Sequence, residues 1–216
     1  MRTFLAMLAV AGLASAAQAE AIFSFGFTDL SGNYNAGTST FTAVGVAGGP
    51  FQTAGNVNRL QAPIGNAQYN AGSAAGLITL TLTVSGVGPT SANGNGTITI
   101  LDADGDRFQS NVTGSFSLVG GAVFFNGLLP NPALVPDGTT NNMFDGPSGG
   151  SFPLTFAPAT GPYTGAVVTL YFDSGSFFGQ PFSGVATNLN GSVIPSPGAL
   201  ALLGTGALLA ARRRRA

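Results

Sequence analysis

The chain has 216 residues, a formal net charge of −1 and only 7% charged residues, against roughly 25% in typical soluble proteins. Because 44% of the residues are hydrophobic, this length predicts one folded domain rather than a disordered chain. The sequence contains no Cys, His, Trp or Lys, which excludes disulfides, thiolate metal sites, a histidine general base and a lysine Schiff base. The composition therefore favours a protein without enzymatic activity.

The first 19 residues have the pattern of a secretory signal peptide. Arg2 supplies the positive charge, residues 4–14 form the apolar core, and Ala17 and Ala19 form an A-x-A cleavage site before Glu20. A membrane-spanning helix is the alternative, but it needs about 20 apolar residues. We expect signal peptidase to remove residues 1–19 during export.

Residues 20–192 are acidic. They contain all eight acidic residues but only two arginines, Arg59 and Arg107, which makes a net charge of −6. Nucleic-acid binding needs a basic face. We therefore expect no nucleic-acid partner.

Apolar and polar residues alternate along several segments of this body, as in half-buried strands. Phe23, Phe25 and Phe27 share one side of the first segment. In the segment 77–84, Ile78 and the alternate apolar residues after it lie opposite three threonines. Further segments of this kind are 96–101, 112–118, 122–125, 151–156, 166–172 and 184–192.

Clusters of Gly, Pro and Asn at 48–50, 86–96 and 145–150 predict turns and loops. Residues 31–75 are less regular, and we expect mostly loop there, with one strand at 39–44. The absence of any helical period in the body predicts an all-β fold. We expect an antiparallel β-sandwich or jelly roll over residues 20–192, with the phenylalanines in its core.

The segment LDADGDR places Asp102, Asp104 and Asp106 at every second position. In an extended strand these carboxylates would lie on one face, about 6.5–7 Å apart. Oxygen ligands in an exported protein suit Ca²⁺, which is the only cofactor the sequence suggests. Gly105 stands at position 4 of the loop, not at position 6 as in an EF-hand. The alternative is a solvated hairpin turn built on the Asp-Gly dipeptide.

Residues 193–216 form a separate C-terminal segment. Its apolar part, 198–211, has 14 residues and would measure about 21 Å as a helix, less than the ~30 Å hydrocarbon core of a membrane. Four arginines, Arg212, Arg213, Arg214 and Arg215, follow at once, and such residues stay on the cytoplasmic side. We expect a short apolar helix that anchors the chain transiently in the inner membrane.

Pro195, Ser196 and Pro197, the apolar stretch 198–211 and the four arginines together resemble the PEP-CTERM sorting signal. Ser196 stands where that family most often has Glu. The resemblance implies processing by an exosortase near the Pro-x-Pro motif. It also implies delivery to the cell surface or extracellular matrix of a Gram-negative-type bacterium that makes exopolysaccharide.

Three functions follow from these observations. The first is a non-enzymatic structural or adhesive role outside the cell, with exopolysaccharide as an expected partner. The second is a glycan- or calcium-dependent binding module that uses the 102–106 turn; a glycan groove without Trp would have to take its aromatic platforms from Tyr34, Tyr69, Tyr163 or Tyr171. The third is a hydrolase, which would need to pair carboxylates of the 102–106 turn with Asp137, Asp145 or Asp173.

Overall fold

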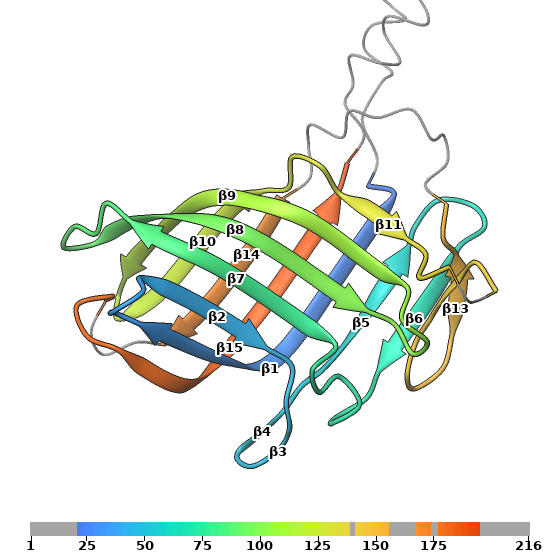
Figure 1. Cartoon of the computed structure of the whole chain (residues 1–216), viewed down its shortest axis with the longest axis horizontal. Coiled ribbons are helices and arrows are strands. Elements are labelled where there is room, and N and C mark those ends of the chain that lie inside the picture. The colour runs from blue at the N-terminus through green and yellow to red at the C-terminus, as the bar shows by residue number, and fades with distance from the viewer. Residues whose placement is uncertain (1–20, 139–140, 156–166, 174–176, 195–216) are drawn as a thin grey trace, which may run out of the picture.

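The computed structural model describes residues 21–138, 141–155, 167–173 and 177–194, and all of its regular elements are β-strands (Figure 1). The prediction of an all-β fold is confirmed. Among the described residues there is no helix whose length and hydrophobicity would let it cross a membrane.

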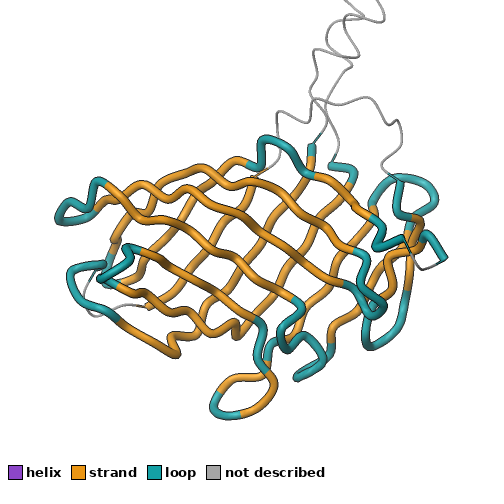
Figure 2. The backbone as a smooth tube through the Cα atoms, viewed as in Figure 1, coloured by secondary structure: helices purple, strands orange, loops and turns teal. Residues whose placement is uncertain are grey.

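Eight antiparallel strands form one closed sheet. In the order of their pairing they are β1 (Phe23–Asn35), β2 (Thr40–Val44), β7 (Ile78–Ser85), β8 (Ser91–Leu101), β9 (Arg107–Val119), β10 (Ala122–Leu128), β14 (Val167–Asp173) and β15 (Phe182–Val193). β15 pairs with β1 along most of its length and closes the ring. Figure 2 shows the near and far walls of this barrel crossing each other.

The predicted β-sandwich is therefore wrong. A sandwich consists of two separate sheets with edges, whereas here the first and last strands of the ring are hydrogen-bonded from Phe23↔Val193 to Tyr34↔Phe182. Both architectures have one apolar and one polar face on each strand. Alternation in the sequence therefore could not distinguish them.

Two strands of the barrel change partners along their length. The first half of β1 pairs with β5 (Ala54–Arg59) and the second half with β2, while the start of β9 pairs with β11 (Ala133–Val135) and its end with β10. β5 also pairs with β6 (Gly65–Tyr69). Two small hairpins complete the fold: β3 (Ala47–Gly48) with β4 (Phe51–Gln52), and β12 (Met143–Asp145) with β13 (Ser151–Pro153). β13 lies beside β6, at the end of the barrel where β5 and β6 lie (Figure 1).

The interior of the barrel is filled by aromatic rings. Near β5 and β13, Phe23 stacks on Phe108 with ring centroids 4.8 Å apart. At the opposite end, Phe41 stacks on Phe172 at 5.0 Å, and Phe178 meets Phe116 edge to face at 4.7 Å. The prediction that phenylalanines form the core is confirmed. The phenylalanines buried in it are Phe23, Phe25, Phe27, Phe41, Phe108, Phe116, Phe125, Phe144, Phe152, Phe172, Phe177 and Phe178.

Three glycines lie side by side on the inner face, where they make room for these rings. Gly94 on β8, Gly114 on β9 and Gly127 on β10 are direct cross-strand neighbours. A Cβ atom on Gly94 would lie 2.8 Å from both the Phe116 and the Phe125 rings, closer than side-chain carbons approach one another. These glycines therefore allow both rings to pack against the backbone of the barrel wall.

Two segments that the sequence favoured as loop are strands. In 31–75, the strand expected at 39–44 is confirmed as β2, but β1 also continues to Asn35, and β5 and β6 follow; in 86–96, β8 begins at Ser91. Their inward positions carry small residues as well as large ones, such as Val57, Ala67 and Ala92. Asn and Gly have low strand propensity, so the alternation of buried and exposed residues in these segments does not stand out in the sequence. The segments become strands because they pair with long neighbouring strands. The strand expected at 151–156 ends at Pro153.

Candidate functional site

The Asp102–Asp106 segment forms the turn between β8 and β9. Leu101 pairs with Arg107 at the end of the ladder, and the Asp102 N–H donates to the Asp106 carbonyl oxygen at 2.9 Å. Gly105 has φ +114°, a conformation that residues with a Cβ rarely adopt. The predicted hairpin turn on the Asp-Gly dipeptide is confirmed.

The turn is solvated only in part, because Asp104 is exposed whereas Asp102 and Asp106 are 2% and 0% exposed. Asp102 Oδ1 accepts the N–H groups of Asp104 (3.0 Å) and Gly105 (2.8 Å), and its Oδ2 accepts the N–H of Asp145 (2.9 Å). Asp106 Oδ1 accepts the N–H of Asp137 at 2.6 Å. These two carboxylates therefore join the hairpin to two distant segments of the chain.

The same carboxylates form an arrangement that suits a cation. One oxygen from each of Asp102, Asp104 and Asp106 can be chosen so that all lie within 4.8 Å of one another. A fourth carboxylate is close, because a Cβ atom on Gly105 would lie 3.2 Å from Asp137 Oδ2. Carboxylate oxygens on a short loop are the ligands that Ca²⁺ prefers. The donor set therefore fits calcium, with Asp104 as its exposed member.

The raised pKa of Asp104 agrees with a cation site at this turn. Desolvation, a hydrogen bond to Asp102 and the negative charges of Asp102, Asp145 and Asp137 all raise the pKa of Asp104. Like charges held this close favour the protonated form, and a bound cation would remove the repulsion. Two of the acids expected as hydrolase partners, Asp137 and Asp145, thus lie at the turn. The side chain of Asp173 lies outside the described part of the structure.

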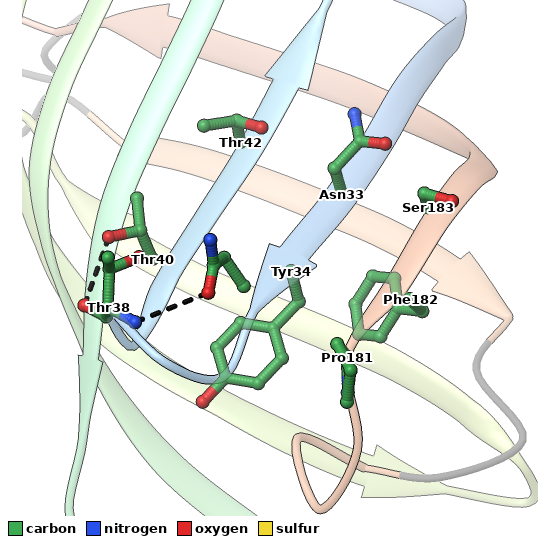
Figure 3. A pocket seen from close by; sticks show the side chains of 9 residues that line it. Asn33, Tyr34, Thr38, Thr40, Thr42, Pro181, Phe182 and Ser183 are labelled. Atoms are coloured by element: carbon green, nitrogen blue, oxygen red, sulfur yellow. Dashed lines mark hydrogen bonds between the residues drawn. The ribbon is translucent and has the colours of Figure 1, made fainter.

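A second feature is a groove of about 820 Å³ where the turn from β1 to β2 approaches the start of β15 (Figure 3). Asn35 Oδ1 shapes the turn by accepting the N–H groups of Gly37 (2.9 Å) and Thr38 (3.3 Å). Phe182 and Tyr34 line the groove, but Tyr34 is only 5% exposed, because its ring packs on Phe178 and Phe182 with centroids 4.8 and 5.8 Å apart, so it is no more an open platform than a core residue. The sequence suggested Tyr34 as a platform but missed the groove, because β15 joins it from about 150 residues away only through the closure of the barrel.

The other tyrosines have different surroundings. Tyr69 is 1% exposed and donates its hydroxyl to the Leu101 carbonyl oxygen at 2.8 Å, so it cannot serve as a platform. Burial, together with the charge of Asp102, raises the pKa of Tyr69. Tyr171 packs against Phe124 on the outer face, with ring centroids 5.2 Å apart and both side chains partly exposed. Tyr163 lies outside the described residues.

The remaining predicted sites also lie outside the described residues. They are the cleavage-site residues Ala17, Ala19 and Glu20, the Pro195, Ser196 and Pro197 motif, and Arg212, Arg213, Arg214 and Arg215, together with the N-terminal signal segment, which a signal helix would occupy, and the short apolar helix expected at 198–211. These assignments stay predictions.

The fold and its turn thus define a closed, antiparallel eight-stranded barrel with an acidic hairpin turn. No family model matches the chain, and neither the curated proteins nor the solved structures contain a match.

Proposed function

We propose that this chain is an exported, non-enzymatic protein with a structural or adhesive role at the cell surface or in the extracellular matrix. The observation that carries the proposal is the construction of the body. Its interior is packed with aromatic rings, and the outer faces of β2, β7 and β8 carry uncharged threonines and asparagines. Such a body offers its outer surface for interactions.

The two ends of the chain carry the predicted signals for export and for sorting to the cell surface. Signal peptidase would cut between Ala19 and Glu20, and the apolar segment 198–211 would form a short helix held in the inner membrane by Arg212–Arg215. An exosortase would then cut near Pro195 and Pro197, as the resemblance to PEP-CTERM signals implies. The body would be released at the surface of a Gram-negative-type bacterium, among its exopolysaccharide.

Cell fractionation and mass spectrometry test this route in the bacterium that makes the protein. We expect the mature chain outside the inner membrane, starting at Glu20 and lacking Arg212–Arg215. A variant with Pro195→Ala and Pro197→Ala should keep its C-terminal segment and stay with the membrane. Pro89→Ala, a change at an exposed loop residue, is the control and should be processed normally. Full-length protein in the cytosol would contradict the proposal.

A calcium-dependent surface module is a second candidate, favoured by the convergence of Asp102, Asp104 and Asp106 within 4.8 Å. A site that binds Ca²⁺ only in the folded state must stabilise that state, by about 2.7 kcal/mol at a concentration 100 times the Kd. We therefore expect millimolar Ca²⁺ to raise the Tm and a chelator to reverse the effect.

Asp104→Asn should abolish this rise in Tm, because it removes the exposed charge from the donor set. Asp29→Asn is the matched control, since Asp29 has φ 58° and asparagine tolerates that conformation. A Tm of the unmodified chain that is the same with calcium and with chelator would exclude this candidate.

A further inference from the structure

One row of side chains crosses five neighbouring strands on the outside of the barrel. Cross-strand pairing aligns Asn33 on β1 with Thr42 on β2, Thr42 with Thr81 on β7, Thr81 with Thr97 on β8, and Thr97 with Asn111 on β9. We call these five residues the hydroxyl–amide band. Four strand spacings of about 4.8 Å give it a length of roughly 19 Å.

The band ends in a depression on each side. Asn33 and Thr42 line the groove of about 820 Å³ beside Tyr34 and Phe182 (Figure 3). Thr97 and Asn111 line a smaller hollow of about 230 Å³. Thr81 lies between the two, so the row connects them across the sheet.

The rows on both sides of the band have the same chemistry. They carry further uncharged hydroxyl and amide side chains at paired positions: Thr79, Thr99 and Gln109 in one row, and Thr40, Thr83, Asn95 and Thr113 in the other. The surface around the band is therefore polar without being charged.

The three central hydroxyls are available to a ligand. Thr42, Thr81 and Thr97 make no side-chain hydrogen bond with another described residue, whereas Thr113 donates to Asn95 Oδ1. Asn33 has a positioning role, because its Oδ1 accepts the Gly184 N–H at 3.0 Å and holds the start of β15 beside the groove. Each free hydroxyl offers one donor and two acceptor lone pairs.

The charge of the surface selects among ligands. An anionic polymer needs cationic side chains, and the body has only two arginines. Arg59 is 3% exposed and donates to the carbonyl oxygens of Gln61 and Pro153, and the Nε of Arg107 donates to Gln109 Oε1. Neither belongs to the band. A neutral polysaccharide, with hydroxyls that pair with Thr and Asn and C–H faces that pack on rings, fits this surface.

We infer that the hydroxyl–amide band binds a neutral polysaccharide chain lying across strands β1, β2, β7, β8 and β9. The groove lined by Asn33, Thr42 and Phe182 holds one sugar ring of that chain. This inference rests on the proposed function and names the class of polymer that the exported body meets.

Affinity electrophoresis of the full chain tests the inference, in native gels that contain dextran, pullulan, laminarin or galactomannan, with alginate as the anionic comparison. We expect retardation by at least one of the neutral polysaccharides and none by alginate. The triple variant Thr42→Val, Thr81→Val, Thr97→Val should bind at least about tenfold more weakly, since each lost hydrogen bond weakens binding a few-fold.

Valine preserves the branched shape that strands favour, so the triple variant should keep the Tm of the unmodified chain. Thr28→Val, at an exposed position of β1 outside the band, is the control and should bind normally. Three results overturn the inference: retardation in none of the neutral polysaccharides, unchanged retardation of the triple variant, or binding to alginate alone. None of these affects the localisation experiment, so the proposed function and this inference fail separately.

Discussion

Replacing Asp102 with alanine is expected to destabilise the protein by at least about 3 kcal/mol. The substitution leaves the part-buried N–H groups of Asp104, Gly105 and Asp145 without their acceptor, and each lost hydrogen bond to a charged group costs about 1.5–3 kcal/mol. Asp102 also joins the β8–β9 turn to β12, so its loss should loosen a contact between segments 43 residues apart. Urea unfolding monitored by circular dichroism measures the effect as a change in the free energy of unfolding.

Asp104→Ala is the matched control, because it removes a carboxylate from the same turn at an exposed position. It should change the free energy of unfolding by no more than about 0.5 kcal/mol. The direction should be stabilising in the absence of calcium, since desolvation and the negative charges of the neighbouring carboxylates raise the pKa of Asp104, and its removal relieves both. Equal effects of the two substitutions would show that Asp102 is not the structural centre of the turn.

The second large effect is expected at Gly114, in the row of inward glycines. A Cβ atom there would overlap the Asn126 carbonyl oxygen, lie 2.5 Å from Gly127 Cα and lie 2.8 Å from Phe125 Cζ. Two of these neighbours are backbone atoms of β10, so a rotamer change cannot make the space. We expect Gly114→Ala to cost at least about 2 kcal/mol, in the range of overpacked cores, as measured by urea unfolding.

Gly88→Ala is the control for this substitution, because its Cβ would lie 3.5 Å from the Ser91 carbonyl oxygen, an ordinary contact. It should be neutral or slightly stabilising, since alanine reduces the freedom of the unfolded chain. Adding Phe125→Leu to Gly114→Ala removes the ring contact but not the backbone contacts. The double variant should therefore recover only part of the loss, and full tolerance of Gly114→Ala would contradict the proposed role of the glycine row.

The glycine row also shows why the sequence concealed part of the fold. In the strand predicted at 112–118, Gly114 and Phe116 are two residues apart and therefore share one face, and in the structure both lie on the inner face of β9. The Gly and Asn residues of the neighbouring segment 86–96 predict a loop, although Ala92 and Gly94 belong to the inner face of β8. A glycine facing a phenylalanine ring across a sheet cannot be distinguished from a turn glycine until the pairing is known.

The candidate sites, too, could be predicted from the sequence only in part. The sequence indicated Asp102, Asp104 and Asp106 as one cluster, because they lie within five residues. It gave no indication that Asp106 accepts the N–H of Asp137 or that Asp102 accepts that of Asp145, since those partners come from distant segments. The hydroxyl–amide band was equally hidden, because its residues come from five strands and align only through their register.

By itself, the sequence determined the all-β class, the positions of the strongly alternating strands and the aromatic character of the core, because local alternation decides which face of a strand is buried. The tertiary structure alone decided that the sheet closes into a barrel, which aspartates are buried and which threonines lie side by side. These features depend on pairing between residues far apart in the chain, such as Phe23 with Val193. The free energy of such pairing depends on both paired segments, so it cannot be predicted from the sequence of either segment alone.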